Sequence, residues 1–171
     1  MHTKAVHRTA RALEEAGHLV LRFNFRGVGA SAGAHDRGIG EQEDARAAID
    51  WLASHAPELP VTMAGFSFGA WVGLLVGAGD RRVDALIALA APVNLFDFSF
   101  LITCAKPKLF LHGTADTIAP LSALEALYPS ISGPKALTRL EGAAHLLTRH
   151  LEEVARAIDE FARALPSGGA P

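Results

Sequence analysis

Residues 60–79, PVTMAGFSFGAWVGLLVGAG, predict a short strand at 60–65, a tight turn, and a strongly apolar helix from about residue 68 to 77. A strand that leads directly into a helix is the first half of a βαβ unit, from which parallel sheets are built. Another apolar strand is predicted soon after this helix, at 83–92. This order of elements favours an α/β fold.

The same alternation continues on both sides of this stretch. Further strands are predicted at 18–25, 107–113 and 135–140, and further helices at 2–16, 41–55, 121–128 and 146–165. Several strands are apolar on both faces, which is typical of parallel strands covered by helices on both sides. We predict one α/β domain over residues 1–165, with a mostly parallel sheet, and a flexible tail at 166–171.

The composition excludes several classes of partner. The chain has 171 residues, half of them hydrophobic, with a formal net charge of −2 and no dense basic cluster. Nucleic acids and anionic membranes are therefore not expected partners. The single cysteine, Cys104, is expected to pack as a small apolar residue and is typical of a reducing compartment. No apolar run is long enough to span a bilayer, so we expect a cytoplasmic protein.

The glycine-rich stretch RFNFRGVGASAG, residues 22–33, has the Gly27-x-Gly29-x-x-Ala32 spacing of a dinucleotide-binding turn. Such a turn opens directly into a helix, and an acidic residue ends the next strand about 20 residues later. Neither condition holds, because another glycine-rich loop follows and the residues at that spacing lie within a predicted helix. We therefore expect no nucleotide cofactor, and we interpret these glycines as a loop at the carboxyl edge of the sheet.

The motif Gly65-x-Ser67-x-Gly69 lies between the strand at 60–65 and the helix that follows it. This context is that of a nucleophile elbow, in which a serine on a strained turn projects its hydroxyl above the sheet. The two glycines are expected to leave room where a Cβ would clash. The motif alone is short, and a plain structural turn is the alternative.

A serine needs a base to remove its proton, and the base needs a carboxylate to orient it. In this kind of fold the order along the chain is serine, acid, histidine. Asp116 follows the strand at 107–113, and His145 follows the strand at 135–140. Ser67, Asp116 and His145 therefore stand in the expected order, each after a strand end.

Alternatives remain open for these side chains. Asp116 can serve only as a turn cap, and His145 only as a loop residue. Competing acids and bases are His112, His150, Glu141, Asp97 and Glu125. The eight histidines form no H-x-x-x-H pair, so no metal site is expected.

Four motifs in order, RFNFRGVGASAG, GFSFG, LFLHGTADTIAP and GAAHLL, resemble the α/β-hydrolase superfamily, and most closely its small, cap-poor bacterial hydrolases of unassigned substrate. The resemblance covers nearly the whole chain. It implies Ser67 as nucleophile, Asp116 as acid, His145 as base and the backbone N–H of Phe68 as an oxyanion donor. Asn24 departs from the family pattern, which often has Asp there.

The resemblance also implies a strand before the first helix, followed by a loop that donates a second oxyanion N–H. The chain begins directly at the helix, so we hypothesise an N-terminally shortened reading frame. In the family's strand order this would leave a gap between 18–25 and 60–65, or make those strands pair with each other. Loss of one oxyanion donor costs about 10²–10³ in turnover.

The sequence therefore predicts a serine hydrolase that cleaves an ester, thioester or amide of a small-molecule acyl substrate. Residues 94–104, NLFDFSFLITC, stand where the family inserts caps. There an acyl pocket and ordinary core packing are both open readings for the apolar residues Phe96, Phe98, Phe100 and Leu101. The rival hypothesis is a non-catalytic domain of the same fold. Substrate identity and oligomeric state are not predicted.

Overall fold

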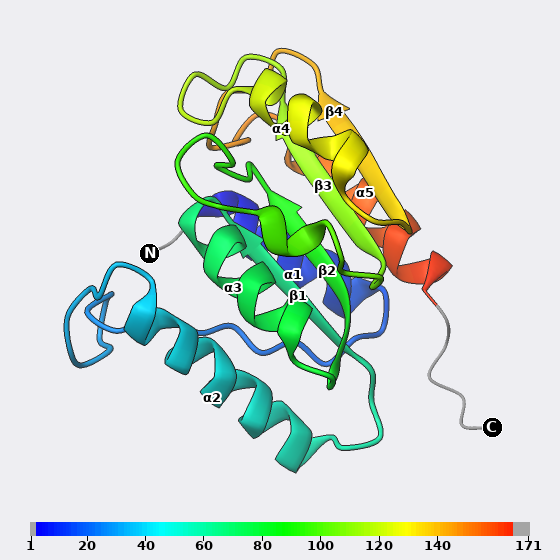
Figure 1. Ribbon diagram of the computed structural model, residues 1–171. Helices are drawn as coiled ribbons and strands as arrows, with labels where there is room; N and C mark the ends of the chain where they lie inside the picture. Colours follow the sequence, from blue (N-terminus) through cyan, green and yellow to red (C-terminus); the bar gives the residue numbers. More distant parts are fainter. Residues whose placement is uncertain (1–2, 166–171) are drawn as a thin grey trace.

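The computed structural model describes residues 3–165, in which helices and strands alternate (Figure 1). The strands are β1 (Val61–Phe66), β2 (Val83–Leu89), β3 (Lys108–Gly113) and β4 (Lys135–Leu140). The α-helices are α1 (Lys4–Glu15), α2 (Ile39–His55), α3 (Phe68–Gly79), α4 (Leu121–Leu127) and α5 (Leu151–Ala164). Two short 3₁₀ helices, η1 (Ser99–Leu101) and η2 (Tyr128–Ser130), complete the order.

The four strands form one parallel sheet in the order β1-β2-β3-β4. Strands β2 and β3 are the central pair, and nearly every residue of both is buried. Because all strands run the same way, their carboxyl ends meet at one edge of the sheet, where ligands bind in such folds. The predicted α/β class is confirmed.

Helices cover the sheet on both faces (Figure 1). On one face, α2, α3 and α4 enclose a core that includes Ile49, Leu74 and Phe110. On the other face, α1 and α5 pack against each other and against the sheet, around Leu13, Leu111 and Ile158. Cys104 lies in the first core as a buried free thiol, as expected from the sequence.

The predicted strand at 18–25 is wrong. These residues are extended, but the structure assigns them to no strand of the sheet. A groove of about 900 Å³, lined mainly by apolar side chains, separates residues 17–23 from β1. An extended chain becomes a strand only when a neighbour supplies hydrogen-bond partners, and here the nearest edge lies across the groove. Of the two outcomes expected for this region, the structure shows the gap.

Two element boundaries also differ from the prediction by three or more residues. Strand β2 ends at Leu89 instead of 92, and α5 begins at Leu151 instead of 146. Leu147 lies within the range predicted as helix, but it is buried from a turn with a φ of 56°. Apolar periodicity identified a buried side chain there but not its backbone conformation. The predicted tail at 166–171 lies outside the described residues.

Within residues 3–165, no helix combines the length and the apolar character needed to cross a membrane.

Candidate active site

Ser67 occupies the turn between β1 and α3, at the carboxyl edge of the sheet. Its backbone has φ 51° and ψ −122°, a region that non-glycine residues rarely adopt. A Cβ on Gly65 would lie 2.3 Å from the carbonyl oxygen of Gly69, so only glycine fits at position 65. A Cβ on Gly69 would meet only the Phe25 ring at 3.7 Å, so the expected lack of room at Gly69 is wrong.

Two loops bring a histidine and an aspartate to this serine. His145 follows β4, and its Nε2 lies 2.9 Å from the Ser67 Oγ. Asp116 follows β3, and its Oδ2 lies 2.7 Å from the Nδ1 of His145. The structure therefore brings together all three side chains that the sequence singled out.

Hydrogen bonds fix the orientation of the aspartate. The backbone N–H groups of Ile118 and Ala119 both donate to the Oδ1 of Asp116, at 2.9 Å each. A carboxylate that accepts these bonds has its Oδ2 left to accept from the Nδ1–H of His145. In that tautomer the Nε2 accepts the hydroxyl hydrogen of Ser67, which is the proton arrangement of a serine activated by a base.

His112 lies beside Asp116 and holds the loop that carries it. Its Nε2 donates to the carbonyl oxygen of Ala119 at 2.7 Å, and within residues 3–165 its buried Nδ1 has no hydrogen-bond partner. Burial lowers the pKa of His112, which keeps the ring neutral beside Asp116. We therefore assign to His112 a structural role.

Three of the other competing side chains are engaged elsewhere. The Nε2 of His150 donates to the backbone carbonyl of Glu141 at 2.9 Å. Asp97 accepts from both the backbone N–H and the hydroxyl of Ser99. Glu125 forms an ion pair with Arg139.

The sequence predicted an oxyanion role for the backbone N–H of Phe68, the residue that directly follows Ser67. Phe68 is the first residue of α3, and the first N–H groups of a helix have no acceptor within it. The positive end of the α3 dipole adds to the same field. An oxygen that becomes negative beside Ser67 would meet this donor.

An aromatic cluster surrounds the Phe68 ring. Phe25, His35 and Phe96 contact it edge to face, with ring centroids 5.9, 5.3 and 5.9 Å away. Trp71 contacts it at 5.9 Å and also stacks on Phe96 at 4.4 Å. The sequence singled out Phe96 but gave no signal for the other rings, which come from segments far apart in the chain.

Only part of the segment 94–104 packs into the core. Phe98 and Leu101 are almost fully buried there, and Phe100 stacks on Phe98. Of the four apolar residues considered for an acyl pocket, only Phe96 contacts a residue adjacent to Ser67. The alternative of ordinary core packing therefore holds for Phe98, Phe100 and Leu101.

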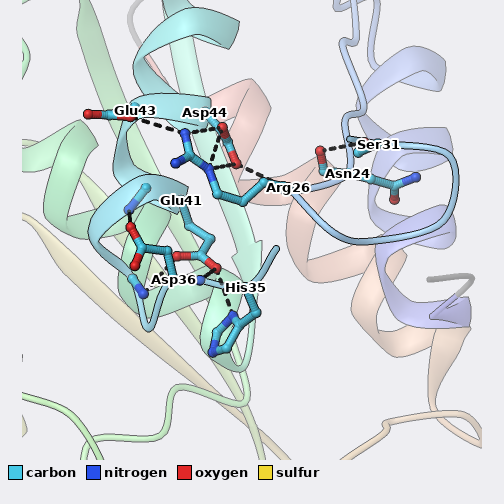
Figure 2. A network of polar contacts seen from close by, with 10 residues as sticks. Asn24, Arg26, Ser31, His35, Asp36, Glu41, Glu43 and Asp44 are labelled. Carbon is cyan, nitrogen blue, oxygen red and sulfur yellow. Dashed lines mark hydrogen bonds and ion pairs between the residues drawn. The ribbon is translucent and has the colours of Figure 1, made fainter. Parts of the chain in front are cut away.

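The loop between residues 26 and 38 is fixed to α2 by ion pairs (Figure 2). The Arg26 guanidinium meets the Asp44 carboxylate at 2.9 Å and also contacts Glu43. The hydrogen bonds from Arg26 hold the pKa of Asp44 below its usual value. The sequence placed these acidic residues at the start of the helix but did not predict that they anchor the loop.

A second carboxylate–histidine pair lies on this loop (Figure 2). Glu41 is fully buried and accepts from the backbone N–H groups of Asp36 and Gly38 at 2.9 and 2.7 Å. The Nδ1 of His35 lies 2.7 Å from the same carboxylate. Burial acts to raise the pKa of Glu41, but the backbone hydrogen bonds and the nearby His35 together lower it.

The 900 Å³ groove is separate from the cluster of Ser67, Asp116 and His145. Its lining includes β1 up to Gly65 but none of Ser67, Asp116 and His145. Among residues 3–165, no group of three or more His, Cys, Asp or Glu side chains could hold a metal ion.

The parallel sheet, the strained serine and the histidine and aspartate beside it define an α/β serine hydrolase fold. A profile described as X-Pro dipeptidyl-peptidase (S15 family) matches residues 2–144, and the chain belongs to this family. It is 35% identical over 170 residues to the uncharacterized protein RP471 of Rickettsia prowazekii, a match that covers 94% of this chain and 71% of that protein.

Two solved structures are also similar. One is an α/β serine hydrolase homologue from Coxiella burnetii, with 38% identity and a TM-score of 0.87 over 94% of this chain and 76% of that one. The other is XC6422 from Xanthomonas campestris, an α/β serine hydrolase without a lid, with 37% identity and a TM-score of 0.89. This match covers 100% of this chain and 77% of that one. The resemblance to the α/β-hydrolase superfamily is confirmed, and the chain is of hydrolase class.

Proposed function

We propose that this protein cleaves an ester, thioester or amide by acyl transfer through Ser67. The continuous chain of hydrogen bonds from Asp116 through His145 to the Ser67 hydroxyl carries the proposal. Family membership and the two serine hydrolase structures described above support it.

In the first half-reaction, His145 takes the hydroxyl proton of Ser67 as the oxygen attacks the substrate carbonyl. The Phe68 N–H donates to the oxygen that becomes negative, and Asp116 stabilises the imidazolium. His145 then passes its proton to the leaving alcohol, thiol or amine. In the second half, water attacks the acyl-enzyme with His145 again as base, which releases the acid and restores the serine.

A fluorophosphonate probe tests the central step, because it labels only a serine whose oxygen is activated. We expect one label per chain on the parent protein and none on Ser67→Ala. Absence of labelling on a folded parent chain would remove the catalytic proposal and favour a non-catalytic domain of the same fold.

Turnover should then be measured on two substrate types. A p-nitrophenyl ester series of graded chain length covers esters, and X-Pro p-nitroanilides cover the amide cleavage named in the family description. The ratio of their kcat/KM values decides between esterase and peptidase activity.

A further inference from the structure

The ring of Phe66 contacts the imidazole of His145. The two ring centroids lie 5.3 Å apart and the ring planes are tilted by 56°, which is the geometry of a direct aromatic contact. Phe66 is the last residue of β1 and immediately precedes Ser67. The end of one strand therefore carries both the nucleophile and a side chain that touches its base. The proposed acyl transfer assigns no role to this contact.

The alternation of side chains along β1 explains why this ring meets His145. Successive residues of a strand point to opposite faces of the sheet. Phe66 and Ala64 pack into the core on the α1 and α5 side, whereas Met63 packs into the core on the other side. The loop that carries His145 connects β4 to α5. Phe66 therefore lies on the face of the sheet to which this loop leads.

The backbone around His145 is anchored in the same core. Ala143 and Leu147, which flank it, are buried and belong to the core against which Phe66 packs. The carbonyl oxygen of Ala143 also accepts a hydrogen bond from the backbone N–H of Ala115 at 3.0 Å. These contacts restrict the backbone of His145, so the orientation of its ring depends on what the side chain touches.

The two hydrogen bonds of the His145 ring leave one rotation weakly restrained. They hold Nδ1 against Asp116 and Nε2 against Ser67, and both bonds point nearly along the line that joins the two nitrogens. A tilt of the ring about this line therefore changes the two bonds little. A contact away from the line restricts the tilt, and the Phe66 ring supplies one. The ring has to keep its orientation because it accepts a proton from Ser67 and then donates it to the leaving group.

We propose that Phe66 is a positioning residue that holds the His145 imidazole in line with the Ser67 hydroxyl. This inference rests on the proposed function, because Phe66 acts only through His145 as the base. An aromatic ring suits this role, since it is rigid and has fewer rotatable bonds than a side chain such as methionine. The residue before the nucleophile therefore serves the active site as well as the strand.

Three substitutions at Phe66 test the proposal, with kcat and KM measured on a p-nitrophenyl ester. Phe66→Leu removes the ring, and Phe66→Met fills most of the same space with a flexible chain. We expect both to lower kcat by about 10- to 100-fold with little change in KM, because a displacement of about 1 Å costs up to about 10²-fold. Phe66→Tyr keeps the ring and should retain most of the parent kcat.

Phe161→Leu is the matched control. Phe161 is also partly buried against the core on the α1 and α5 side, but it lies near the far end of α5, so its loss should leave kcat unchanged. Thermal unfolding shows which variants fold, and Phe66→Met, which conserves volume better, carries the test if Phe66→Leu does not fold. The rate of fluorophosphonate labelling is a second readout, because it depends on the activation of Ser67. We expect it to fall in parallel with kcat.

The inference is overturned if Phe66→Leu and Phe66→Met keep the parent kcat and labelling rate, or if their loss appears in KM alone. It is also overturned if Phe66→Tyr is as slow as Phe66→Leu, or if Phe161→Leu loses as much activity. These outcomes differ from failure of the proposed function, in which the parent chain itself is not labelled at Ser67.

Discussion

Ser67 combines a strained backbone with a complete set of hydrogen-bond partners. A non-glycine residue with positive φ costs about 1–3 kcal/mol, and such strain persists only where the surroundings impose it. Here β1 and α3 impose it from the two sides of the turn. The strain holds the hydroxyl toward His145, so the geometry exists before any substrate arrives.

Replacing Asp116 with asparagine tests the proposed orientation of His145. An amide that donates to Nδ1 stabilises the wrong tautomer, leaving Nε2 protonated and unable to accept the serine proton. We expect kcat on a p-nitrophenyl ester to fall by about 10³–10⁴-fold with little change in KM. The control is Asp50→Asn on the exposed face of α2. An Asp116→Asn rate within a few-fold of the parent would contradict the assignment.

The lowered pKa of Glu41 leads us to predict that the loop at 26–38 is sensitive to acid. The folded state holds the pKa of Glu41 below its ordinary value of 4.5. The unfolded chain therefore takes up this proton at a higher pH than the folded protein does. The resulting stabilisation is present above pH 4.5 and is lost as the pH falls through the folded pKa.

Urea unfolding at about pH 7 and about pH 4 checks this linkage. The parent should be more stable than Glu41→Gln at the higher pH, and the difference in free energy of unfolding should shrink in acid. Glu58→Gln, on an exposed loop, should show no such convergence. A difference independent of pH would show that packing, and not ionisation, accounts for the role of Glu41.

The turn between β1 and α3 allows a direct comparison of two glycines in one motif. A Cβ at position 65 overlaps the Gly69 carbonyl, whereas a Cβ at position 69 makes only an ordinary contact. We expect Gly65→Ala to destabilise the protein by about 1–3 kcal/mol or to prevent folding. Gly69→Ala should be neutral or stabilising by up to about 1 kcal/mol, because alanine is the better helix former. Equal melting temperatures for the two variants would contradict this reading.

Sequence periodicity predicted those elements whose formation depends on their own side chains. The apolar residues of α5, β2 and β3 indicate burial directly, and the existence of these elements was confirmed. The stretch at 18–25 has equally good strand composition, yet a strand also requires a partner edge, which composition does not reveal. The five-residue offset at the start of α5 arose because Leu147 is apolar in a turn.

The candidate site also has one part that the sequence predicted and another part that it did not. Ser67, Asp116 and His145 follow strand ends, so topology alone indicated that they would meet. The aromatic cluster around Phe68 and the pair of His35 with Glu41 join segments whose relative position depends on loop conformation. No spacing rule describes such contacts, and only the acidic start of α2 was visible in advance.

Over the whole molecule, helices cover the two cores at β2, β3 and β4. Beside β1, a groove leaves the cores open. The groove of about 900 Å³ exposes apolar side chains from α1, α2 and β1 along one side of the sheet. Among the described residues, no N–H group from Leu19 to Phe23 donates a backbone hydrogen bond. This region is therefore expected to be weakly stabilised.

Hydrogen–deuterium exchange should reveal this unevenness. We expect amides of residues 19–23 to exchange at rates close to those of an unstructured chain, whereas those of β2 and β3 stay protected up to global unfolding. Peptide-level mass spectrometry resolves the two groups. Comparable protection in both would mean that residues 19–23 acquire partners in solution.

The free side of β1 has a practical consequence. VTMAGF contains neither a charged residue nor a proline, the features with which natural sheets keep foreign strands from adding to an exposed edge. A second molecule can add its own extended segment there, so aggregation should increase with concentration. Handling the protein dilute, or introducing a lysine into this strand, would suppress it.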